Sequence, residues 1–519
     1  MKQYLILALL FIAPAIRAQQ PVIHTDTELL DVVPGQFFVR YYSNSQRKHP
    51  PSLRTLSEYP ELAAELVTAD SRDIGLLMAD PAVRYIEPVP RRYAASLKKA
   101  QLQPNQNNGL YGLVVTKVTE VHARGIDGTG IKIGVADTGI DYRHPDIAPN
   151  YRGGIDTISG DSDPWWNEDP QETHGTHVAG TIIAAHNELG VLGIAYKAEL
   201  YHARVLGPRG GSSASVIDGV RWLVEQAGCR IINLSLGGGR KSKTEEDFYN
   251  LMHSKGVLVI AAAGNEAKDK LSFPARYVVN IAVGAVDRNQ VLASFSNTGK
   301  NIDVVAPGVS VLSTVPQNTS NEAFVEADST ISANPLMFAG LTSDNGITGT
   351  LVDCKIGKPN EFPQSIAGQI ALIERGELSF REKVDNAMKA GAAGVIIYNN
   401  TVGNFVGTLG SPTADGGRSW IPAISVSNFD GEKLKASLNK RVTLFNQLSS
   451  WDTASGTSMA TPHVTGIVAL IWAANPALTN TQVEEILKST AKDLGNPGYD
   501  KSFGFGLVDA SAAVSKAGK

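Results

Sequence analysis

The chain has 519 residues, of which 43% are hydrophobic and 19% charged, so it is long enough for two or three folded units with substantial cores. Its formal net charge is −4 and it has no long run of charges of one sign, which argues against nucleic acid or an anionic membrane surface as a partner. The 50 glycines predict many tight turns and close backbone approaches.

The N-terminal segment MKQYLILALLFIAPAIRAQQ has a lysine at position 2, an apolar run from Tyr4 to Ala15 and small residues after it. This order is typical of a secretory signal peptide, and we expect cleavage after Ala18. A membrane anchor is the weaker alternative, because the run is shorter than the roughly 20 residues that a span needs. The sequence therefore predicts a secreted protein, extracellular or periplasmic, with residues 1–18 as its signal peptide.

Residues 19–104 predict a small mixed unit. GQFFVRYY indicates a strand, and PELAAELVTADSRDIGLLMADPAVRYIEP indicates a helix, a loop and a strand. The charged segment RRYAASLKKAQLQPNQNNG follows, and a segment of this composition is an easy place for proteolysis.

From about residue 110, short apolar runs such as IKIGVAD, RIINLSLGG and VLVIAAAGN alternate with helical patterns. This alternation predicts an α/β domain with a mainly parallel sheet that helices cover on both faces. The alternation breaks at residues 317–448, where GQIALIERGELSFREKVDNAMKAGAAGVIIYNN predicts a strand, a helix that stops at Gly391, and a strand. We therefore expect a main domain of residues 105–316 and 449–519, with an inserted domain at 317–448.

The two cysteines, Cys229 and Cys354, fall in different predicted domains. A secreted chain without a disulfide framework relies on its core and often on bound ions. We expect free thiols, with pairing of the two as the alternative.

Asp137 ends the apolar strand IKIGVAD and is followed by Thr138 and Gly139. At the carboxyl end of a parallel strand, a carboxylate can accept a hydrogen bond from a catalytic group. A turn or a helix cap is the alternative role for an aspartate in this place.

His174 and His177 flank Gly-Thr at the start of a small-residue helix in ETHGTHVAGTII. The pair could bind a metal, but no glutamate lies between them as in the zinc motif. The remaining alternatives are two packed histidines, or a general base at His174.

Ser458 lies among small residues in SWDTASGTSMATPHVTG. Pro462 is tolerated only near the start of a helix, so we expect Ser458 at a helix N-terminus, where the helix dipole favours negative charge. The small neighbours leave room for a substrate backbone. Alone, the motif also fits an ordinary serine at a helix start, and it lacks the G-x-S-x-G of the α/β-hydrolases.

Together, VADTGID, HGTHVAG and GTSMATPHV, in this chain order, resemble the subtilisin-like serine proteases (subtilases, peptidase family S8) over residues 110–316 and 451–513. The resemblance implies a subtilisin-like three-layer α/β fold with a mainly parallel sheet. It also implies an Asp-His-Ser triad: Ser458 as nucleophile, His174 as general base and then acid, and Asp137 orienting the imidazole. His177 is then structural.

The same resemblance implies an oxyanion site and a peptide-binding site. Asn265 in VIAAAGNEA matches the oxyanion asparagine, with the Ser458 N–H as second donor. Two backbone segments would bind an extended peptide by strand addition, and small residues would line the first specificity pocket. The residues concerned are Gly210, Gly211, Ser235, Leu236, Gly237, Ala262, Ala263 and Gly264. Small pocket walls favour a large apolar residue before the scissile bond, although the charged loop EAKDKLSFP also shapes the pocket.

Asp146 and Asn187 match positions that bind calcium in many members of the family, with Asn107 as a third ligand. Oxygen ligands suit calcium, so the resemblance implies a structural calcium ion. The alternative is a solvated aspartate and a turn asparagine.

Residues 19–104 resemble the α+β inhibitory propeptide of the family, chiefly through DPAVRYIEPVPRRY. This implies a zymogen that is cut between residues 93 and 109. Residues 317–448 resemble a β-rich protease-associated (PA) domain, which would restrict access or hold a protein substrate; a spacer is the alternative.

The sequence thus predicts a secreted, monomeric serine endopeptidase that hydrolyses proteins or peptides through an acyl-enzyme and is made as an autoprocessed zymogen inhibited by its own propeptide. We expect neither a nucleic acid partner nor a membrane anchor. Broad digestion is favoured because the pocket segments show no acidic cluster. The alternatives are a limited-specificity processing protease, whose acidic pocket would recognise basic residues, and an inactive protein-binding scaffold.

Overall fold

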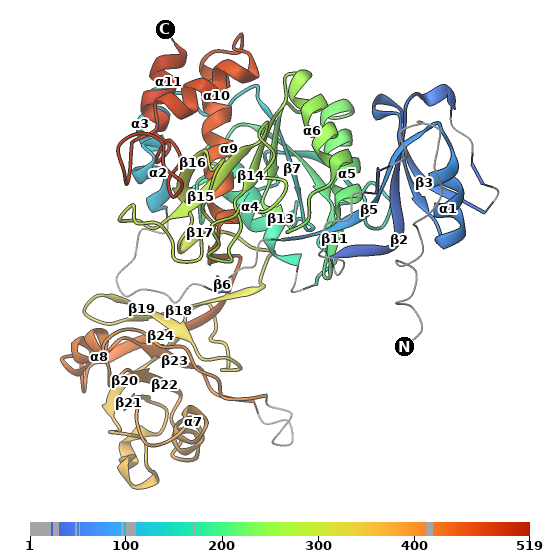
Figure 1. The fold of residues 1–519 in the computed structure, drawn as a ribbon. Helices are drawn as coiled ribbons and strands as arrows, with labels where there is room; N and C mark the ends of the chain where they lie inside the picture. The colour runs from blue at the N-terminus through green and yellow to red at the C-terminus, as the bar shows by residue number, and fades with distance from the viewer. Residues whose placement is uncertain are drawn as a thin grey trace.

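The computed structural model describes residues 22–23, 31–46, 49–50, 52–94, 98–99, 110–169, 172–411 and 419–518. The expected signal peptide and Asn107 lie outside these ranges. Figure 1 shows an N-terminal α+β unit beside a central α/β domain, with a β-rich domain on another side of the central one. No helix in the described ranges is long and apolar enough to cross a membrane.

The central domain is built on a seven-stranded sheet in which every neighbouring pair runs parallel. Its strands, in spatial order, are β16 (Val304–Pro307), β15 (Ile281–Val286), β14 (Leu258–Ala262), β12 (Ile231–Leu234), β7 (Lys132–Asp137), β9 (Glu199–Arg204) and β8 (Tyr151–Asp156). The apolar runs β12, β14, β15 and β16 are buried along their whole length, as expected of strands covered on both faces. The predicted mainly parallel sheet is confirmed.

Helices cover both faces of this sheet. One core contains α4 (His174–Ile183) and α9 (Thr457–Ala474), and the other contains α5 (Ser213–Glu225) and α6 (Lys243–Ser254). Successive residues of a strand point into opposite cores: Ile231 lies in the first core and Ile232 in the second. The smaller helices are α2 (Tyr111–Val115), α3 (Val118–His122), α10 (Asn480–Ser489) and α11 (Ala510–Ala517). The predicted three-layer fold is confirmed.

The N-terminal unit packs against α5 and α6. Its antiparallel strands are ordered β5 (Val83–Ala94), β2 (Val32–Tyr41), β4 (Ala64–Thr68) and β3 (Arg54–Tyr59); β1 (Val22–Ile23) pairs with β5, and α1 (Ser71–Ala79) packs against β5. Phe38 and Tyr59 of this unit belong to the same core as Phe248 of α6. The unit therefore shares its apolar face with the central domain.

The β-rich domain is a closed barrel of strands β18 (Ser320–Glu326), β19 (Thr330–Pro335), β23 (Ala423–Val426), β22 (Gly394–Tyr398), β21 (Ile370–Glu374), β20 (Ile347–Asp353) and β24 (Arg441–Ser449). Helices α7 (Phe380–Lys389) and α8 (Asn428–Lys435) accompany it. Helix α7 stops just before Gly391, which has φ +88°, so the predicted stop is confirmed. The chain leaves and re-enters the central domain through paired strands, β17 (Val311–Thr314) and β25 (Trp451–Ser455).

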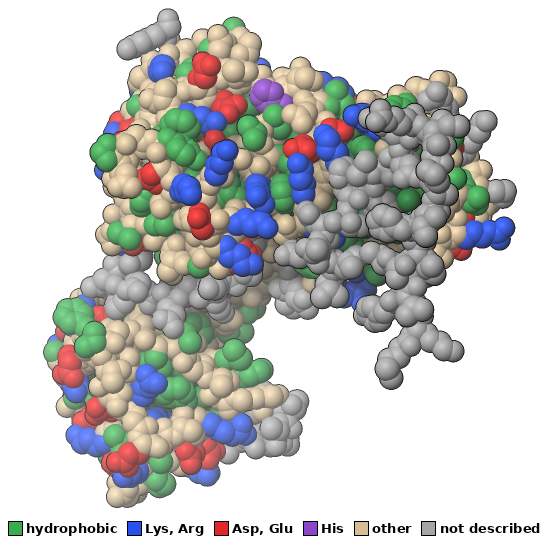
Figure 2. All heavy atoms as spheres, in the orientation of Figure 1, with side chains coloured by type: hydrophobic (Ala, Val, Ile, Leu, Met, Phe, Trp, Pro, Cys, Tyr) green, Lys and Arg blue, Asp and Glu red, His purple; other side chains and the backbone are tan. Residues whose placement is uncertain are grey.

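Cys229 of the central domain and Cys354 of the barrel are free and buried, and burial raises the pKa of each thiol to about 12. On the face drawn in Figure 2, Lys and Arg side chains gather over the middle of the central domain with Asp and Glu among them.

Candidate active site

Asp137 and His174 meet at the carboxyl end of the parallel sheet. Asp137 is the last residue of β7, and His174 is the first residue of α4. His174 Nδ1–H donates a hydrogen bond to Asp137 Oδ1 at 2.5 Å. Asp137 is 0% and His174 2% exposed, so this charge-assisted bond is shielded from water.

A short hydrogen-bonded turn holds the pair in place. The Thr138 N–H donates to Asp137 Oδ1 at 2.7 Å, and the Thr138 hydroxyl accepts the Gly175 N–H at 2.8 Å. A Cβ on Gly175 would lie 2.6 Å from the carbonyl oxygens of Thr138 and Gly139, so only glycine lets the helix start touch the strand end.

Two buried atoms of the pair lack partners in the described part of the chain: Asp137 Oδ2 and His174 Nε2. Buried polar atoms are rarely left without a hydrogen bond, and the exceptions concentrate where chemistry needs them. His174 Nε2 is therefore available to exchange a proton with another group.

Ser458 is the second residue of α9, which confirms its predicted place at a helix N-terminus. It is 0% exposed, and its hydroxyl donates to the Ser235 carbonyl at 2.9 Å. In return, the Ser235 hydroxyl donates to the Ser458 carbonyl at 2.9 Å. Helix α9 packs against α4, so Ser458 and His174 stand at the starts of two adjoining helices.

Asn265 follows β14 and lies against the start of α9. Its Oδ1 accepts the Thr457 N–H at 2.8 Å and the Thr457 hydroxyl at 2.9 Å. These bonds direct its amide nitrogen to the side of Gly456, where a Cβ would lie 3.2 Å from Asn265 Nδ2. The donor end of the amide is thus fixed next to the residues that lead into Ser458.

Strand β5 of the N-terminal unit runs between the two segments assigned to peptide binding. On one side it pairs with β11 (Gly210–Ser212), where Gly211 lies opposite Arg92. On the other side it pairs with β13 (Leu236–Gly237), where Leu236 lies opposite Ala94 and Gly237 opposite Tyr93. Both pairings are antiparallel, so the protein's own chain is bound as an added strand.

The N-terminal part of the chain makes another strand pairing close to Ser458. Strand β6 (Lys98–Lys99) pairs with β25, with Lys98 opposite Ser455 and Lys99 opposite Ala454. Ser455 lies at the end of β25, just before α9 begins. Ala94 therefore pairs next to Ser235, whose carbonyl accepts the Ser458 hydroxyl, and Lys98 pairs with a residue three positions before Ser458. Figure 1 shows β6 next to the central domain.

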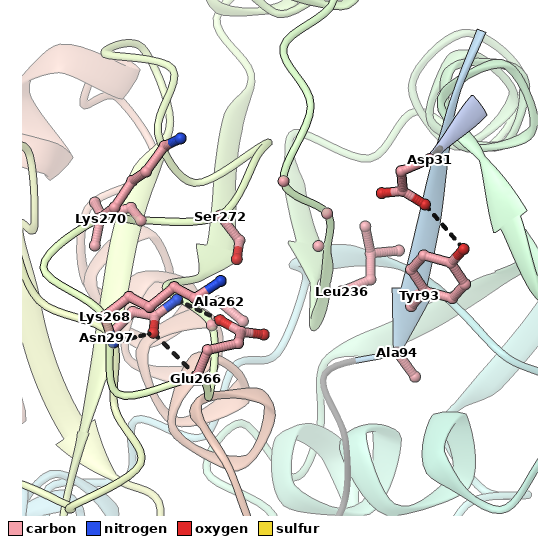
Figure 3. Close-up of a pocket in the computed structure, with 15 residues that line it drawn as sticks. Asp31, Tyr93, Ala94, Leu236, Ala262, Glu266, Lys268, Lys270, Ser272 and Asn297 are labelled. Atoms are coloured by element: carbon pink, nitrogen blue, oxygen red, sulfur yellow. Dashed lines mark hydrogen bonds between the residues drawn. The ribbon is translucent and has the colours of Figure 1, made fainter. Parts of the chain in front are cut away.

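A cavity of about 340 Å³ opens beside β13 (Figure 3). Of the three residues assigned to the specificity pocket, Ala262 and Gly264 line it. Ala263 instead lies in the core with α5 and α6, because successive residues of an extended chain face opposite sides. Gly264 has φ +107°, and a Cβ there would lie 2.5 Å from the Ser272 hydroxyl.

The cavity also carries charges. Figure 3 shows Glu266, Lys268 and Lys270 on one side, facing Asp31 and Tyr93 on the other. Asn297 donates to Glu266 Oε2 at 2.5 Å, and the Tyr93 hydroxyl donates to Asp31 at 2.9 Å. Glu266, Lys268 and Lys270 belong to the charged loop that was expected to shape the pocket, whereas no sequence motif indicated Asp31.

Asp146 and Asn187, the expected calcium ligands, lie side by side. Asn187 Nδ2 donates to Asp146 Oδ1 at 3.0 Å, while Asp146 Oδ2 accepts the Trp451 Nε1–H at 2.7 Å and the Val191 N–H at 3.3 Å. Asp146 is 0% exposed and forms no ion pair with a Lys or Arg among the described residues. A buried carboxylate without a cationic partner fits a cation, whereas the Asn187 amide oxygen here accepts the Leu189 N–H at 3.1 Å and would have to leave it to bind calcium.

His177 does not converge with His174. Its Nε2–H donates to the Val311 carbonyl at 3.1 Å, and burial lowers its pKa to about 3. Within the described ranges there is no cluster of three or more His, Cys, Asp or Glu residues that could hold a metal. Packing is therefore the role that its surroundings favour.

Two family models match the chain: "Subtilase family" over residues 128–337 and "PA domain" over residues 347–434. An alkaline protease from Alkalihalobacillus alcalophilus is 38% identical over 294 residues, which cover 56% of this chain and 72% of the relative. Subtilisin Savinase from Lederbergia lenta is 45% identical over 210 residues, 40% of this chain and 75% of the relative.

Two solved structures are similar as well. The psychrophilic subtilisin-like protease Apa1 from the Antarctic psychrotroph Pseudoalteromonas sp. AS-11 has a TM-score of 0.57 and 30% identity, covering 79% of this chain and 98% of its own. Fervidolysin from Fervidobacterium pennivorans, a keratinolytic enzyme related to subtilisin, has a TM-score of 0.63 and covers 97% of this chain and 64% of its own. At 21% identity, the second likeness supports the fold alone.

Proposed function

The chain belongs to the subtilase family and is a serine endopeptidase, and we propose that Asp137, His174 and Ser458 are its catalytic triad. The observation that carries this proposal is the buried hydrogen bond between His174 and Asp137, which leaves His174 Nε2 without a partner among the described residues. That nitrogen stands at the start of the helix that adjoins the Ser458 helix.

In the proposed reaction, the Ser458 hydroxyl turns from the Ser235 carbonyl to His174 Nε2 and gives up its proton as it attacks the peptide carbonyl. Asp137 holds the imidazole in the right tautomer and stabilises its charged form. The oxyanion accepts hydrogen bonds from the Asn265 amide and the Ser458 N–H at the start of α9. His174 then protonates the leaving amine, and water releases the acyl group by the reverse sequence.

We also propose that the N-terminal unit is an inhibitory propeptide and that the protein is an autoprocessed zymogen. The support is that β5 occupies the peptide-binding segments and that β6 pairs with β25, the strand that leads into the Ser458 helix. The bond cut in processing then lies between Ala94 and Lys98, a narrower interval than the sequence predicts. With this cut the propeptide ends at residue 94–97 instead of 104, and the enzyme domain begins directly after it instead of at 105. The other proposed bounds are 1–18 for the signal peptide and 317–448 for the inserted domain, with the enzyme domain resuming at 449–519.

Two further proposals concern the role of the PA domain and the location of the protein. We propose that the barrel restricts access to the cleft or holds protein substrates, because it joins the central domain through β17 and β25, next to α9. We propose that the protein is secreted, because its N-terminal sequence is typical of a signal peptide. We also propose that the enzyme is a monomer.

Calcium at Asp146 and Asn187 would supply structural stability and take no part in the chemistry. Chelation should lower the melting temperature of the Ser458→Ala protein, and added calcium should restore it. Asp146→Asn should remove this response. A melting temperature that ignores both chelator and calcium would refute the site.

The test of the enzymatic proposal is labelling with a fluorophosphonate probe after propeptide removal, beside casein digestion. Wild type should label and digest, and Ser458→Ala should do neither. A folded, processed wild type that neither labels nor digests would favour the inactive scaffold instead.

A further inference from the structure

Arg92 is a fully buried residue of β5. Its exposed fraction is 0%, whereas its neighbour Tyr93 is 40% exposed. Arg92 lies two positions before Ala94, the last residue of β5 that pairs with β13. Its side chain therefore occupies a pocket just upstream of the bond proposed to be cut.

The pocket that receives this guanidinium is acidic. Arg92 Nη2 donates to Glu245 Oε2 at 2.5 Å, and Arg92 Nε donates to Glu245 Oε1 at 3.2 Å. Nη2 also donates to the Arg240 carbonyl at 3.2 Å. The pair has the bidentate geometry that matches a planar guanidinium to a carboxylate.

Glu245 is itself fixed inside the protease domain. It is the third residue of α6, is 0% exposed, and accepts the Tyr277 hydroxyl at 2.9 Å. The wall of the pocket is close: a Cβ on Gly238 would lie 3.1 Å from Arg92 Nη1. Every pocket group named here belongs to the central domain, and only Arg92 belongs to the N-terminal unit.

Removal of the N-terminal unit would leave this carboxylate without its cation. Burial lowers the pKa of Arg92 and the charge of Glu245 raises it, with a net rise, so the guanidinium remains charged. A buried charge that has lost its partner is costly, and a ligand that restores the partner recovers that free energy. The vacated pocket therefore favours one chemical group above others.

We propose that Glu245 makes this subsite selective for arginine in substrates. The proposal rests on the proposed protease function and deepens it. We consider a substrate peptide that binds in the same register as residues 91–94. Its residue opposite Leu236 takes the place of Ala94, and the residue two positions earlier takes the place of Arg92 against Glu245. An arginine at that earlier position would therefore contact Glu245. Lysine would fit less well, because an ammonium cannot make both bonds in one plane. This selectivity favours the limited-specificity processing protease over broad digestion.

Arg91 provides a matched control within the same strand. Its side chain is only partly buried, and its Nε donates to the Val32 carbonyl at 3.3 Å, an atom of the N-terminal unit. If the subsite attracted any positive charge, replacing Arg91 and replacing Arg92 in a peptide would lower the cleavage rate equally. A subsite built on Glu245 responds to Arg92 alone.

The experiment uses the processed wild-type enzyme and peptides with the sequence of residues 88–101: the parent, Arg92→Leu, Arg92→Lys and Arg91→Leu. Arg92→Leu should lower kcat/KM about 100-fold, and Arg92→Lys about 10-fold. Arg91→Leu should change it less than about 3-fold. Mass spectrometry of the products should place each cut between residues 94 and 98.

An enzyme with Glu245→Gln, produced with Arg92→Leu in its propeptide so that no buried charge is left alone, should cut the parent and Arg92→Leu peptides at similar rates. Casein digestion and probe labelling run beside each assay. If the enzyme labels and digests casein but cuts the parent and Arg92→Leu peptides within about 3-fold of each other, the subsite is refuted and the protease stands. If the processed enzyme neither labels nor digests casein, both proposals fall.

Discussion

Ser458 and Ser235 exchange two hydrogen bonds, since the hydroxyl of each donates to the carbonyl of the other at 2.9 Å. The cause lies in the sequence of α9. Pro462 has no N–H, so the Ser458 carbonyl cannot receive its usual bond from four residues later in the helix. The Ser235 hydroxyl takes that place. The nucleophile's helix is thus tied to the residue that precedes β13.

Ser235→Ala should therefore destabilise the protein. It leaves the buried Ser458 carbonyl without a donor and removes an acceptor from Asn233 Nδ2, which donates to the Ser235 hydroxyl at 2.9 Å. An unsatisfied buried group costs about 1–3 kcal/mol. Urea unfolding of Ser458→Ala with and without Ser235→Ala measures the change. An unchanged midpoint would show that water replaces the hydroxyl at no cost.

Asp137→Asn should lower kcat by about 10⁴ while the fold survives, because the amide favours the wrong imidazole tautomer. Single-turnover acylation by an ester substrate measures the loss. Asp141→Asn is the control: Asp141 is buried in the same region, but Oδ2 accepts the Gln317 N–H instead of a histidine. Equal losses in the two variants would contradict the proposed role of Asp137.

Processing of the wild-type zymogen should produce a new N-terminus within residues 95–98. Ala94 pairs with Leu236, the residue after Ser235, and Lys98 pairs with Ser455, three residues before Ser458, so the proposed cut lies between these two pairings. Ser458→Ala should remain full length, and N-terminal sequencing distinguishes the products. The same cut in Ser458→Ala, produced without other proteases, would show that this serine does not carry out the processing.

Much of the fold could be predicted because its signals are local. The buried strands β12 and β14 are continuous apolar runs, and Gly391 marks the end of α7 through a positive φ. The place of Ser458 follows from Pro462 by simple sterics. Each of these depends on a few consecutive residues, which a single sequence displays.

The Arg92 pocket could not be predicted in this way. Arg92 and Glu245 are 153 residues apart, and Glu245 reads as an ordinary acidic residue in the first turn of a surface helix. Its burial depends on how the N-terminal unit docks on α6. The same limit explains why Ala263 was wrongly assigned to the specificity pocket. The side to which its side chain points depends on the register of β14 with β15, which the sequence does not display.

Glu87 should strengthen inhibition by the N-terminal unit. Its carboxylate accepts the Ser242 hydroxyl and the N–H groups of Lys243 and Thr244, at 2.8, 2.8 and 2.7 Å, and so caps α6 from outside. Loss of a cap costs about 1 kcal/mol or more. Glu87→Ala in the full chain should shorten the lag before casein digestion several-fold, about the factor that this free energy implies. Glu61→Ala, which removes a partly exposed contact with Arg221 at 4.0 Å, is the control, and equal lags in all three proteins would contradict the prediction.

Acid should destabilise the fold through buried neutral histidines. Burial lowers the pKa of His202 and of His463 from 6.5 to about 4. Between these two pKa values, the histidines are protonated in the unfolded chain but neutral in the folded chain. The free energy of unfolding therefore falls as the pH drops from 6.5 to about 4. Above pH 6.5 these groups do not affect it. From about pH 7 to 5, each histidine should cost roughly 2 kcal/mol. Urea unfolding of Ser458→Ala at both pH values measures the fall, and His463→Gln should make it smaller by one histidine's share. An unchanged fall in that variant would mean that His463 is already protonated in the folded protein.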